Sequence, residues 1–134
     1  MGQQQLLLIV LGVIIVGIAV VVGINVFTAS SSNANRDAII SDLTNLASMA
    51  QQFYRKPTAL GGGANTFTGN GGWFATVPAS LKTTVNMGAA VTTTEAAQSE
   101  ILVGTGNQTG NDGTNPVKVT MTVTPNNFTT VINN

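Results

Sequence analysis

The first charged residue of this chain is Arg36, and an almost entirely apolar run extends from Leu6 to Phe27 before it. As a helix, the run would extend roughly 33 Å, enough to cross a bilayer core of about 30 Å. No turn separates it from the amphipathic pattern that follows, so we expect one helix from Gln3 to Lys56. The apolar run must be covered by lipid or by other protein, and this requirement constrains the chain more than any other feature.

Composition excludes several classes of function. Charged residues make up 7% of the chain, and the formal net charge is zero. Nucleic acid is therefore not expected as a primary partner, because phosphate binding needs a surplus of Lys and Arg. The chain has neither Cys nor His, so it lacks disulfides, thiol chemistry, and the commonest general base and metal ligand. We expect no enzymatic activity, no cofactor, and neither a catalytic nor a metal site.

The second half of the expected helix, residues 33–56, is amphipathic. Apolar residues recur there at spacings of four and three and form a stripe on one helix face. Pro57 should end the helix, because it lacks an N–H group and disfavours helical geometry at Lys56. We expect the stripe to pack on the β-rich part of the chain. The predicted helix–head contacts are Ile39, Leu43, Leu46, Ala50 and Phe53.

The remainder of the chain is a glycine-rich connector, residues 57–65, and a β-rich head, residues 66–134. Apolar residues between Val117 and Val123 alternate with Lys and Thr, a period of two that indicates a strand with one buried face. A turn then leads into a returning strand from Phe128 to Ile132. A shorter strand is indicated at Ile101 to Val103.

These elements predict an α+β fold. A long N-terminal α-helix, consisting of an apolar stalk (residues 1–27) and the amphipathic half (33–56), would pack on a small antiparallel sheet of three or four strands. The apolar face of the sheet would cover the helix stripe, and its Thr-rich face would meet solvent.

Other motifs in the head favour structural interpretations. Asn107 and Asn127 each begin an Asn-x-Thr pattern and are candidate glycosylation sites. The loop around Asp112 lacks the ligand spacing of a calcium loop, which favours a plain turn. Glu95 and Glu100, five residues apart, indicate no particular chemistry.

The order of these features resembles that of type IV pilins and pilin-like filament subunits, a bacterial prepilin-processed family. The resemblance covers the whole chain and rests on the apolar helix, its amphipathic extension, the glycine-rich connector and the C-terminal antiparallel sheet. It implies the major structural subunit of an extracellular, type IV pilus-like filament (a fimbrium), which is a single-pass membrane protein before assembly. Such filaments serve cell adhesion, motility, DNA uptake or biofilm formation. The implied partners are copies of the same chain in a helical homopolymer, the inner membrane, a prepilin peptidase and the pilus assembly machinery.

The resemblance also assigns roles along the apolar helix. The polymerisation core would contain Gln5, Leu6, Leu7, Leu8, Val10, Leu11, Ile14, Ile15, Ile18, Val21 and Val22. Met1 would be the mature, methylated N-terminus; alternatively, Met1-Gly2 is a short leader and Gln3 is the processed end. Gln5 stands where most family members carry Glu, and an amide cannot neutralise a neighbour's N-terminal amine. The family's helix-breaking Pro is missing, which leaves Gly17 and Gly23 as weak points of the helix.

Two other interpretations fit the same pattern. One is a minor pseudopilin of a secretion pseudopilus, which would share the fold and the membrane helix. The other is a single-span, membrane-anchored binding module that stays monomeric. A cleaved secretory signal peptide fits less well, because no basic residue precedes the apolar run and the run is long for such a segment.

Overall fold

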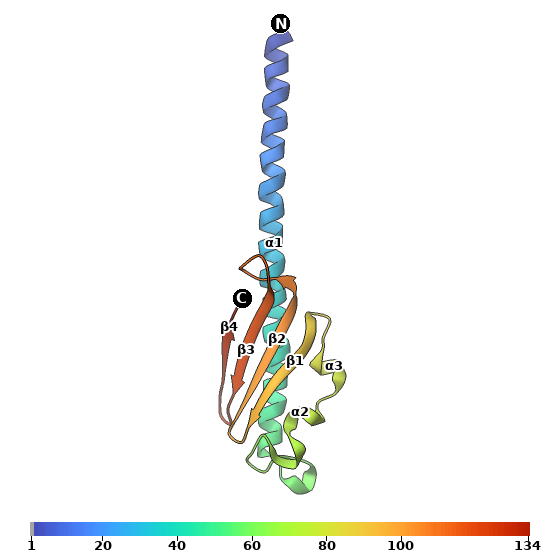
Figure 1. The fold of residues 1–134 in the computed structure, drawn as a ribbon, viewed down its shortest axis with the longest axis vertical. Helices are drawn as coiled ribbons and strands as arrows, with labels where there is room; N and C mark the ends of the chain where they lie inside the picture. The colour runs from blue at the N-terminus through green and yellow to red at the C-terminus, as the bar shows by residue number, and fades with distance from the viewer. Residues whose placement is uncertain (1) are drawn as a thin grey trace. The chain divides into compact units, whose positions relative to one another are not determined.

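The computed structural model describes residues 2–134, and its internal contacts divide the chain into two compact units at Ser31–Ser32. Helix α1 runs from Gly2 to Arg55 and contributes to both units (Figure 1). The sequence prediction of one long helix is confirmed to within one residue at each end. The helix ends where Pro57 interrupts it, and the last turn closes through a hydrogen bond from the Lys56 N–H to the Gln52 carbonyl (3.1 Å).

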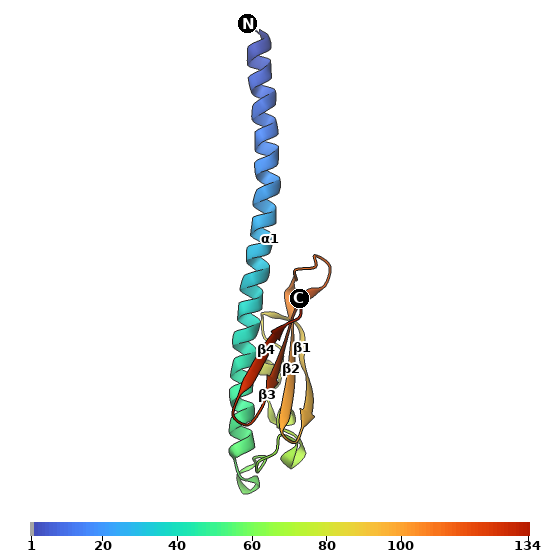
Figure 2. The same ribbon diagram turned by 90° about the vertical axis from the view of Figure 1, so that its left-hand side faces the viewer.

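The globular unit, residues 32–134, has two layers, α1 and a four-stranded antiparallel sheet (Figure 2). The strands follow one another in space as they do in sequence: β1 (Met87–Ala96), β2 (Ser99–Thr109), β3 (Pro116–Val123) and β4 (Phe128–Ile132). Short helical turns connect α1 to β1, namely η1 (Thr58–Leu60), η2 (Gly69–Gly71), α2 (Trp73–Thr76) and α3 (Ala79–Lys82). The predicted α+β fold, with the helix on an antiparallel sheet, is confirmed.

The core of this unit lies between α1 and the inner face of the sheet. Strand β3 alternates as the sequence predicted, so that its four apolar residues from Val117 to Val123 are fully buried. Phe67 and Trp73, from the segment between α1 and β1, complete the core. The sixteen buried hydrophobic residues of the core all lie between Ile39 and Val123.

Strand β2 places its less apolar face against the helix. Leu102 and Gly104 are buried, whereas Ile101 and Val103 are only half-buried on the opposite face. A Cβ atom at Gly104 would lie 2.7 Å from Cγ2 of Ile39, so the glycine allows the helix to approach the strand closely. The strand is eleven residues long, well beyond the predicted Ile101–Val103.

Strand β1 was not predicted, because its small residues and its irregular pairing hide any period of two. Its register with β2 shifts between Met87 and Thr92. The residues just before β1 are held to α1 by side-chain hydrogen bonds. The Asp42 carboxylate accepts hydrogen bonds from the Thr84 hydroxyl (2.6 Å) and from the Asn86 amide (3.1 Å).

The glycine-rich connector packs tightly against the end of α1. The Gly63 N–H donates to the Phe53 carbonyl at 2.8 Å. A Cβ atom at Gly62 would collide with the backbone of Lys56, and one at Gly63 with the carbonyl of Thr66. Two of these glycines are therefore required by close packing.

Candidate functional site

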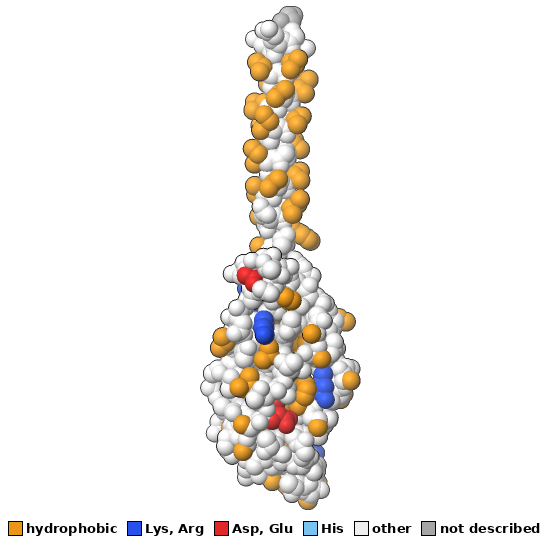
Figure 3. Space-filling model, viewed as in Figure 1, with side chains coloured by type: hydrophobic (Ala, Val, Ile, Leu, Met, Phe, Trp, Pro, Cys, Tyr) orange, Lys and Arg blue, Asp and Glu red, His pale blue; other side chains and the backbone are white. Residues whose placement is uncertain are grey.

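The apolar segment of α1, residues Leu6–Phe27, is the largest exposed apolar surface of the chain. Its large hydrophobic side chains are between 47% and 75% exposed. On the face seen in Figure 3, these side chains lie along both flanks of the segment. All the predicted polymerisation residues lie on it, except Gln5, which is exposed in the turn just before it. The segment has no partner within residues 2–31, the described part of its own unit.

Apolar residues follow one another without interruption at several points, for example from Leu6 to Leu11. At 3.6 residues per turn such a run covers every side of the helix. A helix that is hydrophobic on all sides is normally buried in lipid or in a large protein core. By length and composition, α1 is able to cross a membrane.

Among the described residues, the other features predicted for this segment lie exposed along the helix. Helix α1 continues through Gly17 and Gly23, and a Cβ atom at either would meet nothing within 4 Å. Gln3 and Gln5 lie exposed in the first turns. Met1, the predicted site of processing and methylation, lies outside the described residues.

The predicted helix–head residues lie together in the core of the globular unit. Ile39, Leu43, Leu46 and Ala50 are at most 1% exposed, and Phe53 is 6% exposed. The same helix face also makes polar contacts with the turn between β3 and β4. The Gln51 side-chain amide donates to the carbonyl of Thr124 at 3.1 Å, and a terminal nitrogen of Arg55 donates to the carbonyl of Pro125 at 3.2 Å.

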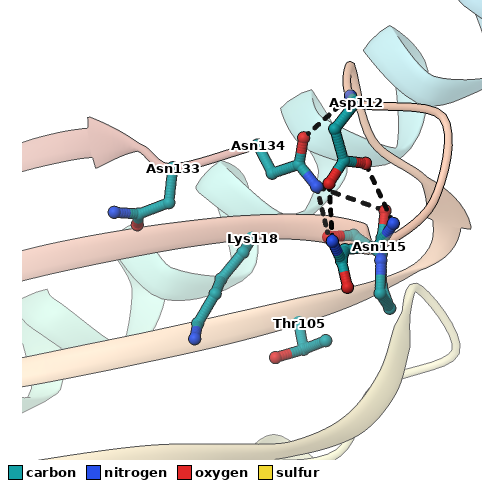
Figure 4. A pocket seen from close by; sticks show the side chains of 7 residues that line it. Thr105, Asp112, Asn115, Lys118, Asn133 and Asn134 are labelled. Carbon is teal, nitrogen blue, oxygen red and sulfur yellow. Dashed lines mark hydrogen bonds between the residues drawn. The ribbon is translucent and has the colours of Figure 1, made fainter.

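The loop between β2 and β3 is fastened to the C-terminus around Asp112 (Figure 4). One carboxylate oxygen accepts hydrogen bonds from the backbone N–H groups of Thr114 and Asn115, both at 2.9 Å. The other accepts from the Asn115 side chain at 2.6 Å, and the Asp112 N–H donates to the Asn134 side chain at 3.1 Å. These donors hold the pKa of Asp112 well below its usual range, the largest contribution coming from the Thr114 N–H. We call this arrangement the C-terminal latch.

The two candidate glycosylation sites are both exposed, Asn107 on β2 and Asn127 in the turn before β4. The Asn107 side-chain nitrogen donates to the carbonyl of Val85 at 2.9 Å. The Asn127 side-chain oxygen accepts from the N–H of Phe128 at 2.8 Å.

Sequence reasoning missed the importance of Glu100. This residue on β2 pairs directly with Glu95 on β1, and its side chain is fully buried. Burial, and secondarily the charge of Glu95, raises the pKa of Glu100 to about 8. Glu100 lies two residues before the apolar Leu102, and this spacing along a strand was the available sign that the two side chains share a face.

Within residues 2–134, no three acidic, Cys or His side chains converge as metal ligands would. The chain matches no protein-family model, no curated protein and no solved structure. The exposed apolar segment and the architecture of the globular unit are the features of the described chain that bear on its function.

Proposed function

We propose that this protein is the major structural subunit of an extracellular, type IV pilus-like filament, in which the apolar segments of many copies pack together. The observation that carries the proposal is the exposure of Leu6–Phe27 on every side of a helix long enough to span a bilayer. Before assembly the same segment would hold the subunit in the membrane.

The globular unit does not need the apolar segment for its own folding core. Its buried hydrophobic cluster lies wholly between Ile39 and Val123, and the amphipathic half of α1 supplies one side of it. The apolar segment is therefore available to another partner. A structural role also agrees with a chain that lacks His and Cys and carries few charges.

Assembly would exchange lipid contacts for contacts between helices. Because lipid tails are as apolar as Leu or Ile, the gain must come from close packing of side chains and not from exclusion of water. A charged side chain placed on this helix would disrupt that packing, and would cost about 2.5–3.5 kcal/mol at the centre of a bilayer. The filament proposal thus predicts strong sensitivity to single charges in the segment.

The test introduces one carboxylate into the segment by Leu11→Asp or, separately, Ile15→Asp. Each side chain is more than half exposed in the isolated subunit. Val85→Asp is the matched control, because Val85 is an exposed apolar residue of the globular unit. Material sheared from cells is examined by negative-stain electron microscopy, and the fibre protein is identified by mass spectrometry.

Fibres of this chain from the wild type and from Val85→Asp, but from neither segment variant, would support the filament. Normal fibres from Leu11→Asp and Ile15→Asp would refute packing through the segment. If the wild type forms no fibres and stays intact in the membrane fraction, the chain is a single-span, membrane-anchored module. The peptide mass would also establish whether Met1 or Gln3 is the mature N-terminus and whether it is methylated.

A further inference from the structure

Glu100 lies in the interior of the globular unit, on the face of β2 that is directed at α1. It shares this face with Leu102 and Gly104, which lie two and four residues further along the strand. A Cβ atom at Gly104 would contact Ile39 and Leu43 of the helix. The Glu100 side chain is 0% exposed. It is the one acidic side chain among the buried residues of the described chain.

Both carboxyl oxygens of Glu100 lack a hydrogen-bond partner among the described residues. An ionised carboxylate without partners in such a place would cost many kcal/mol, and a group in this position is normally neutralised instead. Its strand neighbour adds to this cost, because Glu95 pairs directly with Glu100 across the two strands. We propose that Glu100 is a neutral carboxylic acid in the folded protein at neutral pH, and that its ionisation at alkaline pH loosens the β1–β2 hairpin.

The surroundings of Glu100 offer no positive charge to offset its ionisation. On β3 the inner-face residues are apolar, and Val123 is the direct partner of Glu100. The segment from Phe67 to Phe74 carries no titratable side chain. Asp42 is engaged at the opposite end of β1, where it accepts hydrogen bonds from Thr84 and Asn86.

The other titratable groups at this end of the unit are engaged elsewhere or exposed. Tyr54 donates its hydroxyl to Gln98, and Arg55 donates to the β3–β4 turn. Lys56 is exposed, and the Lys82 ammonium lies 4.5 Å from the centre of the Phe74 ring. Glu95 is therefore the charge that acts on Glu100, and it opposes ionisation.

The hairpin is positioned to transmit the loss of this proton. The Glu95 carboxylate accepts a hydrogen bond from the N–H of Phe74 at 2.8 Å, next to Trp73. The carbonyl of Ala97, in the hairpin turn, accepts from the N–H of Phe67 at 3.1 Å. When Glu100 releases its proton to solvent, a buried carboxylate pairs across the two strands with the half-buried carboxylate of Glu95. Movement of the hairpin end toward water would relieve them and would release the segment that carries Trp73.

The sign of the pH dependence follows from the proton count. In the unfolded chain Glu100 ionises near its ordinary pKa of 4.5, whereas in the folded protein its pKa is raised to about 8. Between these values the folded state holds one proton more than the unfolded state. The stability that this proton contributes to the folded protein is complete below the lower pKa and is lost as the pH rises through the upper one. The folding equilibrium constant should fall up to about tenfold per pH unit in this window.

The test uses the full chain in detergent micelles, unfolded with urea at several pH values from 5 to 9. Trp73 is the only Trp of the chain and is 2% exposed, so its fluorescence reports unfolding. We expect the urea midpoint of the wild type to fall steadily toward pH 8, and Glu100→Gln to remove most of the slope. Asp37→Asn, which changes an exposed carboxylate of α1, is the matched control and should keep the wild-type slope.

Equal slopes in the wild type and in Glu100→Gln would overturn the proposal. Glu95→Gln removes the opposing charge, so the urea midpoint of this variant should stop falling at a lower pH than that of the wild type.

Infrared spectroscopy of the wild type provides a measurement that does not depend on any variant. A carboxylic-acid band that persists at pH 6.5 and disappears above pH 9 is expected, and its absence at pH 6.5 would contradict a neutral Glu100.

Discussion

Replacing Gly104 by Ala tests whether close approach of α1 to β2 holds the globular unit together. The new Cβ atom would lie 2.7 Å from Cγ2 of Ile39 and 3.3 Å from Cδ1 of Leu43. Both partners are fully buried, so neither can move without disturbing the core. Overpacking of this kind costs about 1–3 kcal/mol, and Ala is favoured over Gly in a strand by roughly 0.5–1 kcal/mol. We expect a net loss of about 1–2 kcal/mol in the free energy of unfolding.

A double-mutant cycle with Ile39→Ala isolates the contact itself. Ile39→Ala alone should cost about 2–5 kcal/mol, because it leaves a cavity between helix and sheet. In the double variant the added methyl group enters that cavity. Its stability should therefore equal or exceed that of Ile39→Ala, a coupling of about 1–2 kcal/mol in the favourable direction.

The assay is urea unfolding of the full chain in micelles, followed by Trp73 fluorescence. Ala90→Val adds side-chain volume at an exposed position of β1 and should change stability by less than about 0.5 kcal/mol. If the effects of Gly104→Ala and Ile39→Ala simply add, the glycine is not required for the approach of the helix, and this account of the core is wrong.

Two further predictions concern the ties between the sheet and the rest of the unit. Tyr54→Phe removes the hydrogen bond from the Tyr54 hydroxyl to Gln98 (2.7 Å) and should lower the free energy of unfolding by about 0.5–1.5 kcal/mol in the same urea assay; no change would mean that solvent replaces the bond fully. Asp112→Ala should speed amide hydrogen exchange at Thr114 and Asn115, which lose their acceptor. Because the pKa of Asp112 is lowered in the folded protein, the contribution of the latch to stability is complete above about pH 4, the ordinary value for Asp, and is lost progressively as the pH falls from there through the lowered pKa. Exchange at Thr114 and Asn115 that is equally fast in the wild type and in Asp112→Ala at neutral pH would contradict this role.

The helix and the last two strands were predictable because their patterns are strong and local. The spacing of the apolar residues places one face of α1 in the core, and the alternation in β3 places its apolar side chains on the inner face. Pro57 fixes the end of the helix for a local steric reason. Element boundaries of this kind require no knowledge of the tertiary structure.

The inner face of β2 was not predictable from hydrophobicity. Ile101 and Val103 are more apolar than Glu100 and Gly104, so pattern alone would place the wrong face in the core. The structure buries the other face because its glycines let the helix approach, which only the tertiary packing reveals. The burial of Glu100 follows from this choice of face, so its spacing of two residues from Leu102 becomes informative only once the tertiary packing shows which face of β2 is buried.

The contacts of α1 in the globular unit also determine which part of the helix stays uncovered while the chain is being synthesised. Gln51 binds the carbonyl of Thr124, a partner 73 residues further along the chain. The helix stripe is covered mainly by strands that emerge late, and contacts of such long range form slowly. The apolar segment therefore leaves the ribosome, and can enter a membrane, well before β3 exists. The amphipathic stripe must wait uncovered for its sheet, which makes this interval the stage at which a chaperone or the membrane surface has most to protect.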